Sequence, residues 1–147
     1  MPATGERTDP YANFNFLVQI DGVNVAGFSE CSGLSTDTDP IEYRTGSEDI
    51  TVRKVPGLKK FANVSLKRGM TQNLDLWNWR KTVLDGVTQR KDGSITLLNE
   101  ARQPAMRWHF RQGWPAKWEG PSLNATGNEV AIETLEIAHE GLELEMA

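Results

Sequence analysis

Few residues of the 147-residue chain have the type and spacing that catalysis or metal binding requires. His109 and His139 have no sequence neighbour at metal-ligand spacing, and no H-E-x-x-H, C-x-x-C or D-x-D-x-D-G pattern occurs. The single cysteine, Cys31, lies in Glu-Cys-Ser-Gly-Leu, which is no known nucleophile context, and one cysteine excludes both an internal disulfide and a zinc site of several thiolates. We therefore expect no catalytic residue, no cofactor, no metal and no enzyme activity.

Two further sets of side chains could bind a ligand. Five tryptophans are present, and Trp114 and Trp118 could stack on a sugar or a base if their rings were exposed. Trp77 and Trp108 fall on expected core faces, so core or interface packing is favoured for the set. The glutamates near the C-terminus could hold calcium, but outward carboxylates that alternate along a strand are more typical of a solvated face.

Length and composition describe one soluble domain, residues 1–147. The chain is 38% hydrophobic, 8% aromatic and 24% charged, which is neither a disordered composition nor one that supplies a membrane span. The N-terminus has no basic segment followed by an apolar one, so no export signal is expected and synthesis in the cytoplasm is predicted. Residues 1–12 are expected to form a flexible arm.

Charge is segregated along the chain. Residues 1–50 carry a net −7, residues 51–120 a net +9 and residues 121–147 a net −6, which gives the overall −4. Such blocks could mix on the folded surface, or they could form patches that attract another copy of the chain. Nucleic-acid binding by the basic middle is disfavoured because the pI is about 5.2.

The first half of the chain is expected to be rich in strands. Asn13–Asp21 alternates with period two and Asp21-Gly22 favours a tight turn, so the return segment Val23–Phe28 predicts an opening hairpin. Ser29–Pro40 is expected to be a loop. Ile41–Val55 is expected to form a second, highly charged hairpin, which Pro56-Gly57 ends. Another strand is expected over Phe61–Arg68.

The second half is expected to contain one helix, within residues 73–85, capped by Asn73 and ended by Gly86. Its expected apolar face combines Leu74, Trp77 and Leu84, and Leu76, Trp79 and Val83 extend this face. Ser94–Leu98 and Ala105–Arg111 predict strands, and Pro115 is compatible only with a sheet edge or a strand end. The last segment alternates in two phases, which a bulged strand would explain. One short helix among many strands indicates a mainly β architecture.

Several short sequence blocks, in order from about Tyr11 to the C-terminus, resemble the tail tube family of contractile-tailed phages and phage-tail-like extracellular contractile injection systems. These blocks are Val52–Phe61, Val64–Gly69, Trp77–Trp79, Gly113–Trp118 and Asn128–Leu142. Each block alone is weakly diagnostic, and their order makes the resemblance specific.

The resemblance implies a subunit of an inner tube. It implies two packed antiparallel β-sheets, as a sandwich or half-barrel, with one short α-helix. Six copies would close into a ring-shaped β-barrel, and the rings would stack into a hollow tube inside a contractile sheath. The implied partners are other copies, the sheath, baseplate and cap proteins, and a cargo of effector protein or DNA, in a cytoplasmic or released particle or a virion tail.

The resemblance also implies an element that reaches the adjoining ring, and residues 41–58 are its expected position. Four basic residues of this segment and of the two positions after it would face acidic residues of another subunit or ring; they are Arg53, Lys54, Lys59 and Lys60. The complete expected interface set is Glu42, Tyr43, Arg44, Glu48, Asp49, Arg53, Lys54, Pro56, Gly57, Leu58, Lys59 and Lys60.

Two alternatives stay open from the sequence. One is a low-copy tube initiator or cap-proximal paralogue of the same machine, which would share the fold. The other is a monomeric β-sandwich that binds carbohydrate through Trp114 and Trp118.

Overall fold

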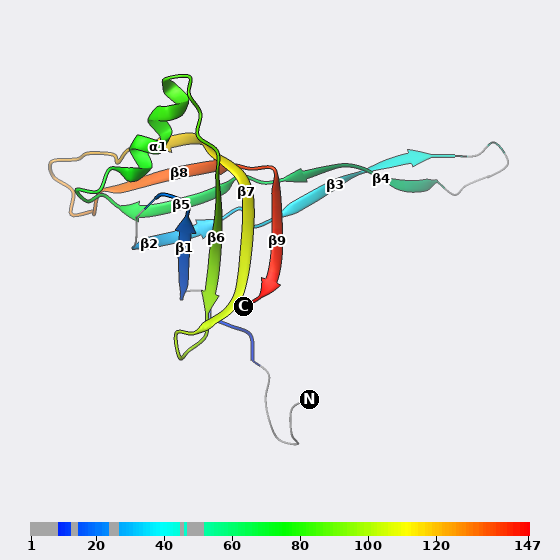
Figure 1. Cartoon of the computed structure of the whole chain (residues 1–147), viewed down its shortest axis with the longest axis horizontal. Helices are drawn as coiled ribbons and strands as arrows, with labels where there is room; N and C mark the ends of the chain where they lie inside the picture. The colour runs from blue at the N-terminus through cyan, green and yellow to red at the C-terminus, as the bar shows by residue number, and fades with distance from the viewer. Residues whose placement is uncertain (1–8, 13–14, 24–26, 45, 47–51) are drawn as a thin grey trace, which may run out of the picture.

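The structure, a computed structural model, describes residues 9–12, 15–23, 27–44, 46 and 52–147 (Figure 1). It contains nine strands and one helix within these residues, so the mainly β prediction is confirmed. In chain order the elements are β1 (Phe16–Ile20), β2 (Phe28–Ser32), β3 (Thr36–Tyr43), β4 (Arg53–Phe61), β5 (Val64–Gly69), α1 (Asp75–Leu84), β6 (Lys91–Leu98), β7 (Pro104–Glu119), β8 (Ile132–Ala138) and β9 (Gly141–Met146).

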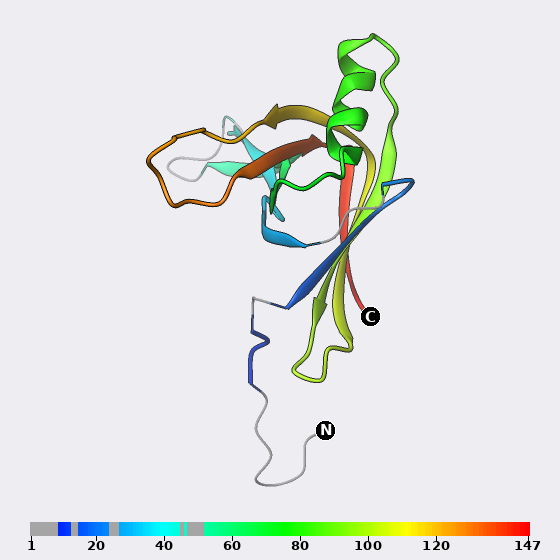
Figure 2. The ribbon, with the colours of Figure 1, turned by 90° about the vertical axis from the view of Figure 1, so that its left-hand side faces the viewer.

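Two antiparallel layers share strand β7. The first sheet has the order β1, β6, the N-terminal half of β7 and β9, and the second sheet has the order of the C-terminal half of β7, β8, β5 and β2. Figure 2 shows β7 curving from one layer into the other. The change of layer falls at Gln112, whose φ of 53° lies in the left-handed region, and at the following Gly113. Neither sheet closes on itself, so both keep free edges.

The core lies between the two sheets. The second sheet contributes Val64, Leu66, Leu135 and Ile137, each fully buried, and the first contributes Phe110, which is 1% exposed. These positions recur at every second residue of their strands, as one buried sheet face requires. The prediction of strands over Phe61–Arg68, Ser94–Leu98 and Ala105–Arg111 is thereby confirmed.

The helix α1 lies beside β7, at the end of the molecule where the two layers meet (Figure 2). The N-cap position is Leu74 and not Asn73 as expected, but Asn73 Oδ1 accepts a hydrogen bond from the Asp75 backbone N–H at 2.8 Å. Gly86 follows the helix with a φ of 79°, as expected. The expected apolar face is confirmed in part, because Leu76 and Trp79, which extend it, are the buried side chains of the helix. Leu74 and Leu84 are at least half exposed.

The expected opening hairpin is described only in part. Asp21-Gly22 does turn the chain, with a φ of 71° at Gly22, and the isolated bridge between Ile20 and Val23 follows. Within the described residues the strands on either side of this turn pair with distant strands: β1 pairs with β6 over five residues, and β2 pairs with β5. The pairing with β6 places Val18 and Ile20 beside the apolar face of that strand. Residues 24–26 lie outside the described part.

Residues 29–40, expected to be a loop, contain β2 and most of β3. All eight residues of β3 are exposed, so no apolar periodicity marks this strand. Backbone hydrogen bonds to its partner β4 hold it as a strand. Side-chain contacts add to this pairing, such as the hydrogen bond that Thr36 Oγ1 donates to the Lys60 carbonyl at 3.1 Å. Pro56-Gly57 lies inside β4 and does not end it, which corrects the expected break; a shift of register occurs opposite, between Thr38 and Pro40.

The position of Pro115 in the sheet is compatible with its lack of a backbone N–H. In its C-terminal half β7 pairs with β8 alone, so Pro115 occupies an edge strand, as predicted. The described residues include no helix long and apolar enough to cross a membrane.

Candidate functional site

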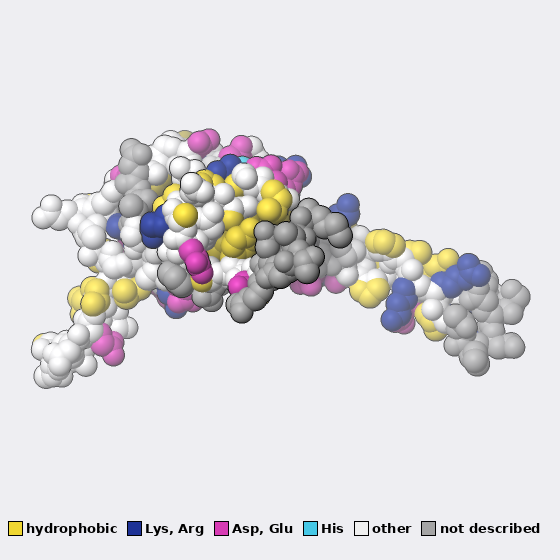
Figure 3. Space-filling model, turned by 90° about the horizontal axis from the view of Figure 1, so that it is seen from below, with side chains coloured by type: hydrophobic (Ala, Val, Ile, Leu, Met, Phe, Trp, Pro, Cys, Tyr) yellow, Lys and Arg dark blue, Asp and Glu magenta, His cyan; other side chains and the backbone are white. Residues whose placement is uncertain are grey.

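Strands β3 and β4 form a separate two-stranded sheet that projects from the body of the molecule (Figure 1). We call it the projecting hairpin. Figure 3 shows it standing clear of the two layers, with basic and apolar side chains along its length. A two-stranded hairpin without a covering layer is marginally stable in water. Its length and exposure therefore favour a surface that is completed by another molecule.

The projecting hairpin carries the described members of the expected interface. Glu42 and Tyr43 lie on β3, Arg44 follows it directly, and Arg53, Lys54, Pro56, Gly57, Leu58, Lys59 and Lys60 lie on β4. The structure thus brings these ten residues together on one element. Glu48 and Asp49 lie outside the described residues.

The hairpin's charges have counterparts within the same chain. Lys60 Nζ lies 2.8 Å from Asp39 Oδ2, and the strand register places Glu42 directly opposite Lys54. Both members of the Lys60–Asp39 pair are more than half exposed, so the pair contributes at most about 1 kcal/mol. Asp39 was missing from the expected set, because its position opposite the basic strand depends on a register that the sequence does not reveal.

Apolar side chains on the hairpin are also accessible. Leu58 is 75% exposed and Ile41 52%. Gly57 is required for the close approach of the strands, because a Cβ there would lie 2.6 Å from the Asp39 carbonyl oxygen. Exposed apolar side chains that are flanked by polar ones are typical of a protein interaction site.

The free edges of the first sheet form a second candidate surface, which sequence reasoning missed. Within the described residues β1 pairs only with β6, and β9 pairs only with β7. Edge strands usually carry charges that prevent pairing with other chains, but Phe16–Ile20 has none. The absence of charge in this strand can be seen in the sequence, whereas the position of β1 at a sheet edge cannot.

The second sheet offers a poorer edge at β7. Pro115 has no N–H to donate, and its carbonyl oxygen already accepts a hydrogen bond from Arg80 Nη1 at 2.9 Å. The helix therefore covers the point at which another strand would have to add.

The first sheet has a polar face, opposite the core, that we define by two rows of residues across its four strands. The pairing registers give Gln19–Ser94–His109–Glu143 and Leu17–Thr96–Arg107–Glu145. His109 Nε2 lies 2.7 Å from Glu145 Oε1, and Arg107 Nε donates to Thr96 Oγ1 at 3.1 Å.

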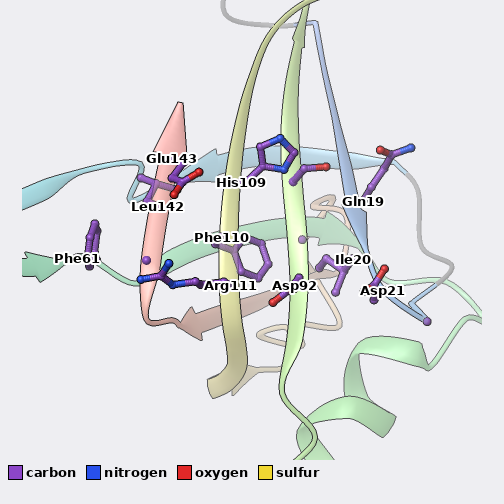
Figure 4. A pocket seen from close by; sticks show the side chains of 14 residues that line it. Gln19, Ile20, Asp21, Phe61, Asp92, His109, Phe110, Arg111, Leu142 and Glu143 are labelled. Atoms are coloured by element: carbon purple, nitrogen blue, oxygen red, sulfur yellow. The ribbon is translucent and has the colours of Figure 1, made fainter. Parts of the chain in front are cut away.

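A hollow of about 610 Å³ adjoins the first of these rows (Figure 4). Gln19 on β1, His109 on β7 and Glu143 on β9 reach its lining, and Asp92 and Arg111 contribute further charges. The Asp92 carboxylate accepts a hydrogen bond from the Gln112 backbone N–H at 2.9 Å. In the described part of the chain no group of three or more His, Cys, Asp or Glu side chains is arranged to hold a metal ion.

The two candidate sugar-stacking tryptophans do not form a free platform. The Trp118 ring lies 4.9 Å from the Trp77 ring, centroid to centroid, and its Nε1 donates to Glu133 Oε2 at 3.1 Å. Trp118 also packs against the core. Trp114 is partly buried on the same strand.

Comparisons with known proteins separate a tube protein from a carbohydrate-binding one. The sequence model of the family described as T4-like virus tail tube protein gp19 matches residues 12–143. The chain belongs to this tail tube family. No curated protein matches it in sequence. The family is one of structural tube proteins, and the carbohydrate-binding alternative has no support.

Solved structures agree with this family. A chain of the PVC sheath-tube complex, from an extracellular contractile injection system in the extended state, is 26% identical with a TM-score of 0.84, over 94% of this tail tube protein and 93% of that chain. A chain of the anti-feeding prophage baseplate is also 26% identical, with a TM-score of 0.84 and coverage of 95% and 97%. Hcp1 from Flavobacterium johnsoniae shares the fold at 13% identity, with a TM-score of 0.54 over 87% and 94%.

Proposed function

We propose that this tail tube protein is the repeating subunit of the inner tube of a contractile injection particle. Six copies close into a ring, and rings stack into a hollow tube. The observation that carries the proposal is the pair of free, antiparallel edges on the first sheet of a chain with the tail tube fold.

Ring closure uses β1 of one copy and β9 of the next. The first sheet has four strands in alternating directions, so these two edges meet as antiparallel strands all around a ring. The register between the two copies must place like faces side by side, because a slip of one residue would set the Glu143 side chain beside the apolar side chains of the neighbouring β1. Closure also protects the uncharged edge of β1 from pairing with unrelated chains.

The dimensions of such a ring place the second sheet on its outside. Six four-stranded sheets give a circumference of roughly 115 Å at about 4.8 Å per strand, hence a radius of roughly 18 Å. A second layer packed about 10 Å further inward would fill the middle with its side chains. The open arrangement therefore turns the polar face of the first sheet toward the channel, and carries α1 and the projecting hairpin outside.

The projecting hairpin makes the contact between rings. Its exposed Leu58 and Ile41 are buried there, and its basic residues Arg53, Lys54, Lys59 and Lys60 approach acidic residues of a neighbouring copy. The expected interface set keeps this role as part of the proposal, including Glu48 and Asp49.

The proposed partners are those of similar assemblies. Chains similar to this one occur in a sheath-tube complex, a baseplate, a tube-terminating cap and a sheath/tube terminator, at 26% identity in each case. We infer sheath, baseplate and cap contacts for this chain, and a protein or DNA cargo in the channel. The particle is an assembled, phage-tail-like one.

A low-copy position near the baseplate or cap is the second candidate, favoured by the matches to those assemblies. Copy number in purified particles separates the two. A repeating subunit gives many copies for each baseplate, whereas an initiator or cap-proximal ring gives about six.

Disulfide crosslinking tests the ring. In a Cys31→Ala background, Leu144→Cys is combined with a cysteine on the same face of β1, at Phe16, Val18 or Ile20, or on the opposite face, at Leu17 or Gln19. At least one same-face pair should give a ladder that ends at the hexamer in non-reducing gels, since opposed strand residues reach disulfide distance. A ladder from the opposite-face pairs, or monomers only, contradicts the proposed edge pairing.

Leu58→Asp tests the hairpin separately. Rings should still form, but negative-stain images should show few stacked tubes. Stacking at the level of the unmodified protein would remove the hairpin from the ring-to-ring contact.

A further inference from the structure

The charges on the polar face of the first sheet are arranged by strand. Strand β7 contributes the bases Arg107, His109 and Arg111, and β9 contributes the acids Glu143 and Glu145. Because β7 and β9 are neighbours, each acid of β9 lies directly opposite a base: Glu145 opposite Arg107, and Glu143 opposite His109.

One close contact joins the two strands on this face, and we use the word network for these five charged or titratable side chains of β7 and β9. His109 Nε2 lies 2.7 Å from Glu145 Oε1. Glu145 is two residues along β9 from Glu143, the residue directly opposite His109. Side chains at such diagonal positions are within reach across an antiparallel pair. The Arg107 guanidinium is oriented from the other side by Thr96, at 3.1 Å. Each carboxylate is therefore within reach of two basic side chains.

The network faces solvent in the single chain. The His109 and Glu145 side chains are 44% and 55% exposed. No core packing explains the placement of these charges, and exposed pairs of this kind add little to stability. Their effect is on the electrostatic potential of the surface, where two arginines are balanced by two glutamates.

We propose that Glu143 and Glu145 neutralise the basic row of the channel wall, so that cargo slides along paired charges and a polyanion is not retained. This inference rests on the proposed tube, which turns the polar face inward. Without the two carboxylates, the Arg107 and Arg111 side chains, on the order of twelve in a six-membered ring, would face each other across a narrow channel, offset in part by Asp21 and Asp92, which line the same hollow as Arg111. A confined basic surface of this density binds nucleic acid through its phosphates.

The test uses assembled tubes with Glu143→Gln and Glu145→Gln together. A fluorescent single-stranded oligonucleotide is mixed with subunits during assembly, tubes are recovered by sedimentation, and the oligonucleotide that survives nuclease is measured. We expect at least a tenfold rise over unmodified tubes, and a steep fall of retention as salt increases.

A matched control changes the same net charge elsewhere. Glu119→Gln with Glu136→Gln leaves Lys117 without its two acidic neighbours on the second sheet, which lie 3.2 and 4.0 Å from its Nζ. This variant should retain no nuclease-resistant oligonucleotide. Adding Arg107→Gln and Arg111→Gln to the first variant should abolish retention again, which also shows that the effect does not come from misassembly.

The outcomes separate this inference from the proposed tube. If unmodified protein forms no rings or tubes in negative-stain images, the proposed function fails. If tubes form and retention is the same in the Glu143/Glu145 variant as in unmodified tubes or in the control, the role of the two carboxylates is wrong. If oligonucleotide sediments with the variant tubes but is degraded by nuclease, the polar face lies on the outside of the tube, and the inference is overturned as well.

Discussion

Arg68 and Glu133 face each other across β5 and β8 and form an ion pair in which each side chain is at most 3% exposed. Arg68 also donates to Thr71 Oγ1 at 3.1 Å and to the Asn73 carbonyl at 2.6 Å, and Trp118 Nε1 donates to Glu133. The pair thereby connects both central strands of the second sheet with β7 and with the segment that leads into α1.

Removing one member of this pair should be strongly destabilising. Glu133→Gln leaves the Arg68 guanidinium buried without a countercharge, which typically costs about 3–5 kcal/mol of unfolding free energy. Urea unfolding followed by tryptophan fluorescence measures this change. Glu136→Gln on the same strand is the matched control, since its contact with Lys117 is partly exposed and at 4.0 Å; it should change stability by less than about 1 kcal/mol. Equal effects of the two variants would contradict the buried pair's role.

Phe110 lies against two glycines. A Cβ at Gly93 would meet the Phe110 ring at 2.4 Å, and one at Gly113 would meet it at 2.5 Å. We therefore expect Gly93→Ala to destabilise the protein by about 1–3 kcal/mol through overpacking, as measured by thermal or urea unfolding. Gly46→Ala, where nothing lies within 4 Å, should be nearly neutral. Combining Gly93→Ala with Phe110→Leu should cost less than the sum of the single changes, and strict additivity would disprove the clash.

Burial raises the pKa of the Cys31 thiol to about 11 from its ordinary 9.0. The native protein should therefore react slowly with iodoacetamide at pH 8, and rapidly once urea exposes the thiol. Because the folded pKa is the higher one, the protonated thiol's contribution to stability is complete below about pH 9 and is lost as the pH rises toward 11. Cys31→Ala should remove this part of the pH dependence. Equally fast alkylation of native and unfolded protein would contradict the burial.

The opposed Glu42 and Lys54 on the projecting hairpin offer a test of its charge pattern. Lys54→Glu places two acids opposite each other and should reduce stacking of rings into tubes, since like charges directly opposite are destabilising. The double reversal Glu42→Lys with Lys54→Glu should restore tube length in negative-stain images. Failure of the double variant to recover would show that Lys54 pairs with a different acid, such as one on another copy.

Much of the fold could be predicted from alternation along the sequence. The strands Ser94–Leu98 and Ala105–Arg111 and the single helix could be predicted from the sequence pattern, although Leu74 and Leu84 of the expected helix face are exposed. Strand β8 shows why periodicity also misleads. Its buried positions are residues 133, 135 and 137, and the first is Glu133, so the apolar pattern breaks where the buried ion pair lies.

Long-range pairing accounts for most of the remaining errors. Asp21-Gly22 carries a strong local signal for a hairpin, yet β1 joins β6, more than seventy residues away in the chain. Strand β3 has no buried residue, so only its pairing with β4 makes it a strand. The described members of the expected interface gather on one element because β3 and β4 pair with each other. The sheet edges and the polar face depend on strand order, which no local pattern contains.

Strand β7 runs without interruption through both layers, from Pro104 to Glu119. A tube that is driven forward experiences axial load, and load applied to the outer layer must reach the inner one. Side-chain packing alone would let two layers slide, whereas a single covalent backbone shared by both resists that shear directly. In the proposed tube, the same strand that organises the fold is a mechanical linkage between the outer surface of each subunit and its channel wall.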